Sequence, residues 1–135
     1  MMAQSQHKGR CLCGAVTLTA TPKSHVFGAC HCKMCQRWGG GPLLAIVCGT
    51  NVVLDGKDDI AVFDSSEWAE RGFCRQCGTH LFYRMKQELT YAIPIGVFDD
   101  IENWHFGEQI FIEDKPSCYS FADQTVMKTG KEVFG

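Results

Sequence analysis

Short alternating segments dominate the hydrophobic pattern of this chain. Between residues 15 and 20, Val16, Leu18 and Ala20 fall on one face of an extended chain and Thr17 and Thr19 on the other, as in a half-buried strand. Further β-rich runs, separated by Gly, Asp, Asn and Pro, occupy residues 43–47, 52–54, 60–63, 80–84, 90–95 and 109–112. No long helical period competes with them. The pattern therefore predicts an all-β fold of short, mostly antiparallel strands.

Two segments could form short helical turns. The first is 33–38, which ends before the glycine run 39–41, and the second is the acidic segment 99–103. Both are too short to be stable alone. The polar tail after residue 122 predicts a loosely attached end, although Val126, Met127, Val133 and Phe134 could dock it. At 135 residues and 45% hydrophobic content, the chain suits one core better than two. We therefore predict a single domain over residues 1–135, with residues after about 123 peripheral.

The charge balance argues against two classes of partner. Thirteen basic and fifteen acidic residues give a formal charge of −2, which provides no general attraction to phosphate backbones or anionic membranes. No apolar stretch is long enough to cross a bilayer, and the opening residues lack the apolar centre of a secretory signal. We expect a cytoplasmic protein without nucleic-acid or membrane partners. An exposed strand edge could support a homodimer, although no residue pattern requires one.

Cysteine spacing is the main chemical signal. Seven of the nine cysteines lie in three tight clusters. The reducing cytoplasm disfavours structural disulfides, and an odd cysteine count fits a disulfide framework poorly. Metal binding is the better interpretation. The clustered residues are Cys11 and Cys13, then Cys30, Cys32 and Cys35, then Cys74 and Cys77.

The first and last clusters together make a complete four-thiolate shell. In an extended segment Cys11 and Cys13 point the same way, and Cys74 and Cys77 form a CxxC turn. A glycine follows each pair and allows the chain to turn tightly around bound sulfur. Four thiolates close a tetrahedral zinc site, which predicts a structural metal. Iron is the minor alternative.

The middle cluster, Cys30, Cys32 and Cys35, has only three cysteines within six residues. Three ligands define an open site, with one position free for water or substrate. We expect solvent or substrate in that position. The alternatives from the chain itself are His31, Cys48, His80 and Cys118, although Cys48 follows an apolar run and suits the core.

These residues lie in motifs that carry a family resemblance. The motifs are Gly9-Arg-Cys-Leu-Cys-Gly-Ala-Val16, Cys30-His-Cys-Lys-Met-Cys-Gln36 and Arg71-Gly-Phe-Cys-Arg-Gln-Cys-Gly-Thr-His-Leu81. They resemble the glutathione-dependent formaldehyde-activating enzyme family, which also includes centromere protein V. The later segments 95–100 and 109–116 look like the family's glycine-aspartate turn and final strand, so only the tail after residue 123 lies outside the resemblance. One departure is Ser117-Cys118, where the family usually has Ser-Trp; the aromatic is missing or moved to Tyr119.

The resemblance implies a small zinc-containing β-tent fold and a carbon–sulfur lyase. It places a structural zinc on Cys11, Cys13, Cys74 and Cys77, and a labile or catalytic zinc on Cys30, Cys32 and Cys35. The substrates would be a thiol such as glutathione and a small aldehyde such as formaldehyde. We expect His31 or a water to handle the proton, and Arg37 to contact a carboxylate of glutathione.

Two other functions suit the same residues. A non-catalytic zinc module could use the β scaffold to bind a protein partner, with the middle metal only stabilising a loop. Alternatively, Cys30, Cys32 and Cys35 could lose zinc and oxidise, which would suit redox or metal handling.

Overall fold

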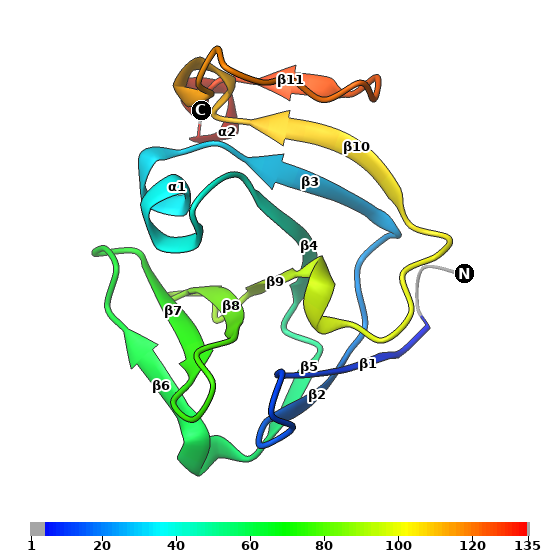
Figure 1. The fold of residues 1–135 in the computed structure, drawn as a ribbon, viewed down its shortest axis with the longest axis vertical. Coiled ribbons are helices and arrows are strands. Elements are labelled where there is room, and N and C mark those ends of the chain that lie inside the picture. The colour runs from blue at the N-terminus through cyan, green and yellow to red at the C-terminus, as the bar shows by residue number, and fades with distance from the viewer. Residues whose placement is uncertain (1–4, 135) are drawn as a thin grey trace. The chain divides into compact units, whose positions relative to one another are not determined.

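The computed structural model describes residues 5–134; the opening residues, which the sequence predicts not to form a secretory signal, lie partly outside this range. The chain gathers into two compact units, and each is described by itself. The first unit contains the described residues up to His25 together with Ile46–Asn103, and the second contains Val26–Ala45 and the described residues from Trp104 onwards (Figure 1). The single domain predicted over residues 1–135 stays a prediction.

A three-stranded antiparallel sheet opens the first unit. It joins β1 (His7–Arg10), β2 (Thr17–Ala20) and β5 (Val52–Asp55) in the order β1-β2-β5. The predicted alternation is confirmed, because Val16, Leu18 and Ala20 are buried while Thr17 is exposed and Thr19 half-buried. The burial of one face thus follows directly from the sequence pattern.

A glycine allows β1 to pack closely against a later turn. A Cβ on Gly9 would lie 2.6 Å from the carbonyl oxygen of Val97, which belongs to the short 3-10 helix η3 (Ile95–Val97). Gly9 bridges Phe98, and the N–H of Asp99 donates to the carbonyl of Lys8 at 2.9 Å. Because Gly9 has no side chain, the 95–100 segment can pack beside the start of the chain.

Four further strands of the first unit pair antiparallel in succession. They are β6 (Ile60–Phe63), β7 (Ala69–Cys74), β8 (His80–Met85) and β9 (Tyr91–Pro94). The sequence predicts β6, β8 and β9 but not β7, whose run of residues contains Glu70 and Arg71. In the structure Arg71 is 3% exposed and lies over the ring of Tyr83, and Glu70 pairs with Arg84. Residues of the neighbouring strand thus pair with these charged side chains, which in the sequence alone indicate a loop.

The second unit combines antiparallel and parallel pairing. β3 (Val26–Cys30) pairs antiparallel with the first residues of β4 (Leu43–Gly49), and parallel with β10 (His105–Ile110), which pairs parallel with β11 (Val126–Lys128). The sequence misses β3 and β11. The strand predicted over residues 109–112 overlaps β10 only at Gln109 and Ile110, because β10 begins at His105 and ends at Ile110. A 3-10 helix, η4 (Ile112–Asp114), follows it.

The helices are short. The predicted helix is α1 (Lys33–Gly39), which ends where Gly40 adopts a left-handed conformation and its N–H donates to the carbonyl of Gln36 at 2.8 Å. The helical turn predicted over residues 99–103 is wrong, since this segment forms a non-helical turn in which Asp100 accepts from the N–H of Glu102. A further 3-10 turn is η2 (Lys57–Asp59). None of the helices within residues 5–134 has the length and apolar character needed to span a membrane.

The tail is attached through β11, α2 and Phe134, one of the residues that could dock it. β11 lies on β10, and α2 (Gly130–Phe134) follows it. The ring of Phe134 packs edge-on against Phe111 at 5.8 Å between centroids, and the N–H of Gly130 donates to the carboxylate of Glu113. Backbone pairing, which polar residues can supply as well as apolar ones, thus attaches the tail together with the Phe134 contact.

Candidate metal centres

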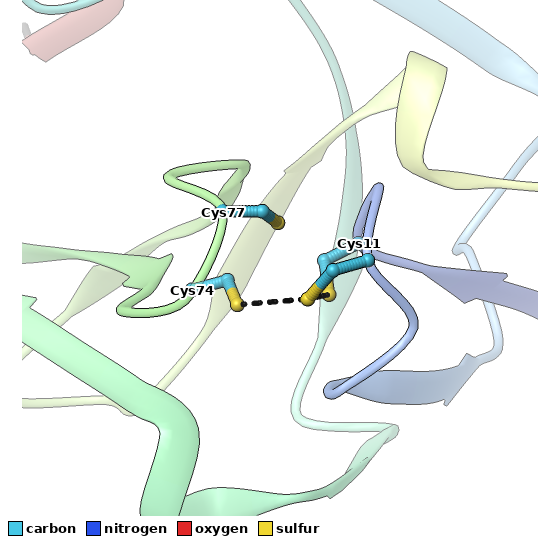
Figure 2. A group of neighbouring side chains, drawn as sticks. Cys11, Cys74 and Cys77 are labelled. Carbon is cyan, nitrogen blue, oxygen red and sulfur yellow. Dashed lines mark hydrogen bonds between the residues drawn. The ribbon is translucent and has the colours of Figure 1, made fainter.

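Four cysteine sulfurs converge in the first unit, as the spacing predicts. Cys11 and Cys13 lie in the turn between β1 and β2, while Cys74 and Cys77 lie at the connection between β7 and β8; Figure 2 shows Cys74 and Cys77 pointing from one turn towards Cys11 on the other. All four sulfurs lie within 4.8 Å of one another. The sulfur of Cys13 is 3.6 Å from that of Cys11 and 3.8 Å from that of Cys74.

These separations suit a tetrahedral zinc ion. A Zn–S bond of about 2.3 Å in tetrahedral geometry places neighbouring sulfurs about 3.8 Å apart. The observed values of 3.6 and 3.8 Å fit that requirement without rearrangement. The donor set, four thiols and no carboxylate, also matches the soft ligands that structural zinc prefers.

The local geometry of the first pair differs from the prediction. Cys11 and Cys13 lie in a turn rather than an extended segment, closed by hydrogen bonds from Gly14 N–H to the Cys11 carbonyl (3.1 Å) and from Cys11 N–H to the Val16 carbonyl (3.0 Å). Gly14 has φ +83° and Gly78, after the second pair, has φ +80°. The predicted tight glycine turns are therefore confirmed, and a turn rather than strand alternation brings the first two sulfurs together.

Backbone N–H groups point at the sulfurs of this cluster. The N–H of Val16 donates to Cys11 Sγ at 3.3 Å, and that of Gln76 to Cys74 Sγ at 3.4 Å. Such donors stabilise the thiolate form. The N–H of Leu12 also donates to the Thr79 hydroxyl at 3.0 Å, which joins the two turns directly.

Because the four sulfurs lie close together, their thiols have different pKa values. The hydroxyl and N–H of Thr79 lower the pKa of Cys77 to about 5. The N–H of Ala15 lowers the pKa of Cys13, but burial and the neighbouring thiols outweigh it and raise that pKa to about 12. One thiolate thus suppresses ionisation of the next. A divalent cation would remove this repulsion and allow all four to ionise.

The second unit holds the three-cysteine cluster. Cys30 ends β3, Cys32 is the N-cap of α1, and Cys35 lies in the first turn of that helix. The three sulfurs lie within 4.8 Å of one another, and the N–H of Cys35 donates to Cys32 Sγ at 3.3 Å. Cys35 is buried, whereas Cys30 and Cys32 are partly exposed. The sulfurs of Cys32 and Cys35, together with burial, raise the pKa of Cys30.

Gln36 holds this loop in place. Its side-chain amide donates to the carbonyl of His31 at 2.7 Å and to the carbonyl of Asp114 at 2.9 Å. The amide therefore joins α1 both to the cysteine loop and to η4. Rigid attachment of this kind preserves ligand geometry before a metal arrives.

Within residues 5–134, the donor atoms that gather at this cluster belong to the three cysteines. Cys48 is buried in β4, where burial raises its pKa to about 12 and its thiol donates to the carbonyl of Ile46, so its predicted core role is confirmed. Among the described residues, neither the exposed Cys118 nor His80 belongs to this cluster. The geometry thus agrees with an open three-thiolate site.

The His31 side chain faces the protein interior rather than solvent. Its side chain is fully buried, and its Nε2 lies 2.8 Å from Oε1 of Gln109. The Gln109 amide donates in turn to the Thr125 hydroxyl at 3.0 Å. Sequence reasoning leaves His31 as either a proton carrier or an exposed residue, and the structure excludes exposure. Its catalytic role stays a prediction.

The surroundings of His31 include Tyr119, a position to which the sequence resemblance allows the family's aromatic to have moved, and other residues that the sequence does not single out. The ring lies 6.4 Å from Tyr119 and 6.1 Å from Phe121 between centroids. Tyr119 thus supplies an aromatic ring one position after Cys118. An adjacent cavity of about 290 Å³ is lined by Gln109, Ile112, Lys115, Ser120, Phe121 and Met127. The only sequence signal for this pocket is the density of aromatic residues after Pro116.

Arg37, the predicted glutathione contact, lies in the last turn of α1 and is exposed. It follows Cys35 by two positions on the same short helix, whose first turn carries that cysteine. An exposed guanidinium can reach a carboxylate from solvent. Its contact with substrate stays a prediction.

The cysteine pattern and both clusters agree with a match to a known family. A family model described as glutathione-dependent formaldehyde-activating enzyme matches residues 6–114, which include all seven clustered cysteines. The chain belongs to this family. The match ends at residue 114, short of the limit near residue 123 that the sequence resemblance suggests.

Two similar proteins align with most of this chain. An uncharacterized lyase of Schizosaccharomyces pombe is 36% identical over 129 residues, covering 95% of this chain and 94% of the relative. A protein of Halomonas elongata, provisionally named as a glutathione-dependent formaldehyde-activating enzyme, is 25% identical over 120 residues, covering 81% of this chain and 76% of that protein. These two relatives thus have lengths similar to that of this chain.

A solved structure shares the fold. The crystal structure of a Rhodobacter sphaeroides protein aligns with a TM-score of 0.61 and 20% identity, covering 71% of this chain and 91% of that one. At this identity the likeness shows the fold alone. It supports the mostly β architecture described above.

Proposed function

We propose that this protein is a zinc-dependent carbon–sulfur lyase acting on the adduct between a thiol such as glutathione and a small aldehyde such as formaldehyde. Family membership supports the reaction class. The observation that carries the proposal is the second cluster, where three sulfurs lie within 4.8 Å and two of the cysteines are partly exposed. Three protein ligands with one accessible side are typical of a reactive zinc site.

In this proposal the two cysteine clusters have different roles. Cys11, Cys13, Cys74 and Cys77 have the separations of a closed shell and join two distant turns of the first unit. Their metal would be structural. Cys30, Cys32 and Cys35 would hold the second zinc, and a zinc ion there would lower the pKa of a bound thiol and polarise a carbonyl.

The reaction itself is a reversible addition. In the forward direction the thiol sulfur forms a bond to the carbonyl carbon, and the thiol proton goes to the carbonyl oxygen; the reverse reaction breaks that carbon–sulfur bond and returns the proton. No electron acceptor or donor is required. The protein must therefore position two small molecules and provide a path for one proton.

The chain's own residues suggest how these tasks are met. Cys30 and Cys32 present partly exposed sulfurs, while buried Cys35 anchors the loop in α1. Arg37 is available for a glutathione carboxylate. The buried His31, bound to Gln109, better suits positioning the loop than direct proton transfer, which leaves water as the proton carrier.

A mutational comparison tests the proposal. The proteins compared are the wild-type chain, Cys32→Ser and the exposed control Cys118→Ser. Exchange NMR would measure the rate at which thiol and aldehyde interconvert with their adduct at equilibrium, and elemental analysis would measure the zinc content. We expect wild type and Cys118→Ser to bind two zinc ions and to accelerate exchange. Cys32→Ser should lose one zinc and at least about a hundredfold in rate, with thermal stability largely retained.

The outcomes separate this function from its alternatives. Unchanged turnover in Cys32→Ser would show that the second cluster is not the catalyst. Two tightly held zinc ions without turnover on any thiol or aldehyde tested would favour a protein-interaction module. Reversible oxidation of the three thiols with zinc release, again without turnover, would favour redox or metal handling. The cytoplasmic location remains part of the proposal.

A further inference from the structure

A third group of potential ligands lies at the start of β1, away from both cysteine clusters. Nε2 of His7 is 3.2 Å from Nε2 of His25. The hydroxyl oxygen of Ser5 is 3.3 Å from the former and 3.5 Å from the latter. Three donor atoms from two separate segments of the first unit thus form a nearly equilateral triangle.

Both imidazoles are held by the surrounding fold. His7 is the first residue of β1 and pairs with Ala20 of β2. Its ring packs edge-on against Phe98 at 6.4 Å and against His25 at 5.1 Å between centroids. His25 ends the bend after β2, where Lys23 donates from its N–H to the carbonyl of Val47 at 3.2 Å. The two rings therefore approach each other from anchored backbone.

The triangle has the dimensions of a metal site. A tetrahedral zinc with Zn–N bonds of about 2.0–2.1 Å separates its ligand atoms by about 3.3–3.4 Å. The observed separations lie between 3.2 and 3.5 Å. Imidazole is a preferred ligand of Zn²⁺, Ni²⁺ and Cu²⁺. The carboxylate of Asp100 also interacts electrostatically with the His7 ring and favours a cation there.

We propose that His7 and His25 form a binding site for a divalent transition-metal ion, with the Ser5 hydroxyl or water beside them. The site is distinct from the cysteine clusters and independent of the lyase function. A metal held there links the start of β1 to the segment that follows β2. Because two neutral side chains and a hydroxyl carry no negative charge, binding is weaker and more exchangeable than at a four-thiolate site.

Isothermal titration with Zn²⁺ at pH 7.5 tests the site on the full chain. The protein would first be loaded until elemental analysis shows that the cysteine clusters are saturated. We expect wild type to take up one further equivalent, and His7→Ala and His25→Ala each to weaken this binding by at least about tenfold. Glu88→Gln removes an exposed carboxylate from the turn between β8 and β9 and should leave binding unchanged.

A second measurement does not depend on the variants. Imidazole ¹⁵N NMR of the wild-type chain should show the Nε2 signals of His7 and His25 shifting together as the further equivalent of Zn²⁺ binds. If no further equivalent binds, or if both histidine variants bind it as wild type does, the short Nε2 to Nε2 distance is only an N–H···N hydrogen bond and the proposal is overturned. Loss of binding in Glu88→Gln would equally overturn it.

Discussion

Replacing Cys74 by serine should weaken the binding of the zinc that we propose joins two turns of the first unit. Cys74 is fully buried, and its sulfur lies 3.8 Å from that of Cys13, which is 61 positions earlier in the chain. Structural zinc contributes about 10–16 kcal/mol to folding in small zinc domains. A chain of 135 residues is typically stable by only about 7–20 kcal/mol. The proposed metal would therefore account for much of the net stability.

A conservative magnitude follows from the loss of one ligand in four. A quarter of the zinc contribution is about 2.5–4 kcal/mol. At about 4 °C per kcal/mol for a chain of this size, Tm should fall by about 10–16 °C. Complete release of zinc would lower it further and abolish cooperative unfolding. Cys74→Ser should therefore be a stability variant, unlike Cys32→Ser.

The assay is thermal unfolding followed by circular dichroism, paired with zinc determination on the same samples. Cys48→Ser is the matched control, because Cys48 is also buried but lies outside both clusters. Its thiol already donates to the Ile46 carbonyl, so a hydroxyl keeps a partner and should cost only about 1–2 kcal/mol. A Cys74→Ser protein that loses one zinc and keeps the Tm of wild type would refute the structural assignment.

Two further changes test the surroundings of the clusters. Gln109→Leu removes the partner of His31 Nε2 and of the Thr125 hydroxyl. Because a buried polar group is left unpaired, the free energy of unfolding, measured with urea, should fall by about 1–3 kcal/mol. Gln109→Glu should recover part of this loss if hydrogen bonding is the cause. Burial, and then the charge of Arg71, lower the pKa of His80 below its ordinary 6.5. Because the unfolded chain then takes up the proton first, the stability of wild type relative to His80→Gln should fall as pH decreases below 6.5. Urea unfolding at pH 8, 7 and 6 measures it, and a constant difference between the two proteins would contradict this.

Much of the fold was accessible from residue patterns because the relevant forces are local. The alternation around Leu18 identifies the buried face of β2, and turn residues mark the ends of β5, β6 and β8. β7 was missed since its buried positions include Arg71, whose partner Tyr83 comes from the next strand. β11 was missed since backbone pairing, rather than apolar side chains, attaches it. Local patterns do not record such partners.

The candidate metal centres show the same division. The sequence by itself determined which cysteines belong together, because ligand number and spacing are properties of the covalent chain and of metal chemistry. Only the tertiary structure decided that Cys11 and Cys13 meet through a turn, and that His31 points into the interior towards Gln109. It also brought His7 to His25. Spacing fixes ligand sets within a short segment, whereas the direction of a side chain and the pairing of distant segments depend on how the whole chain packs.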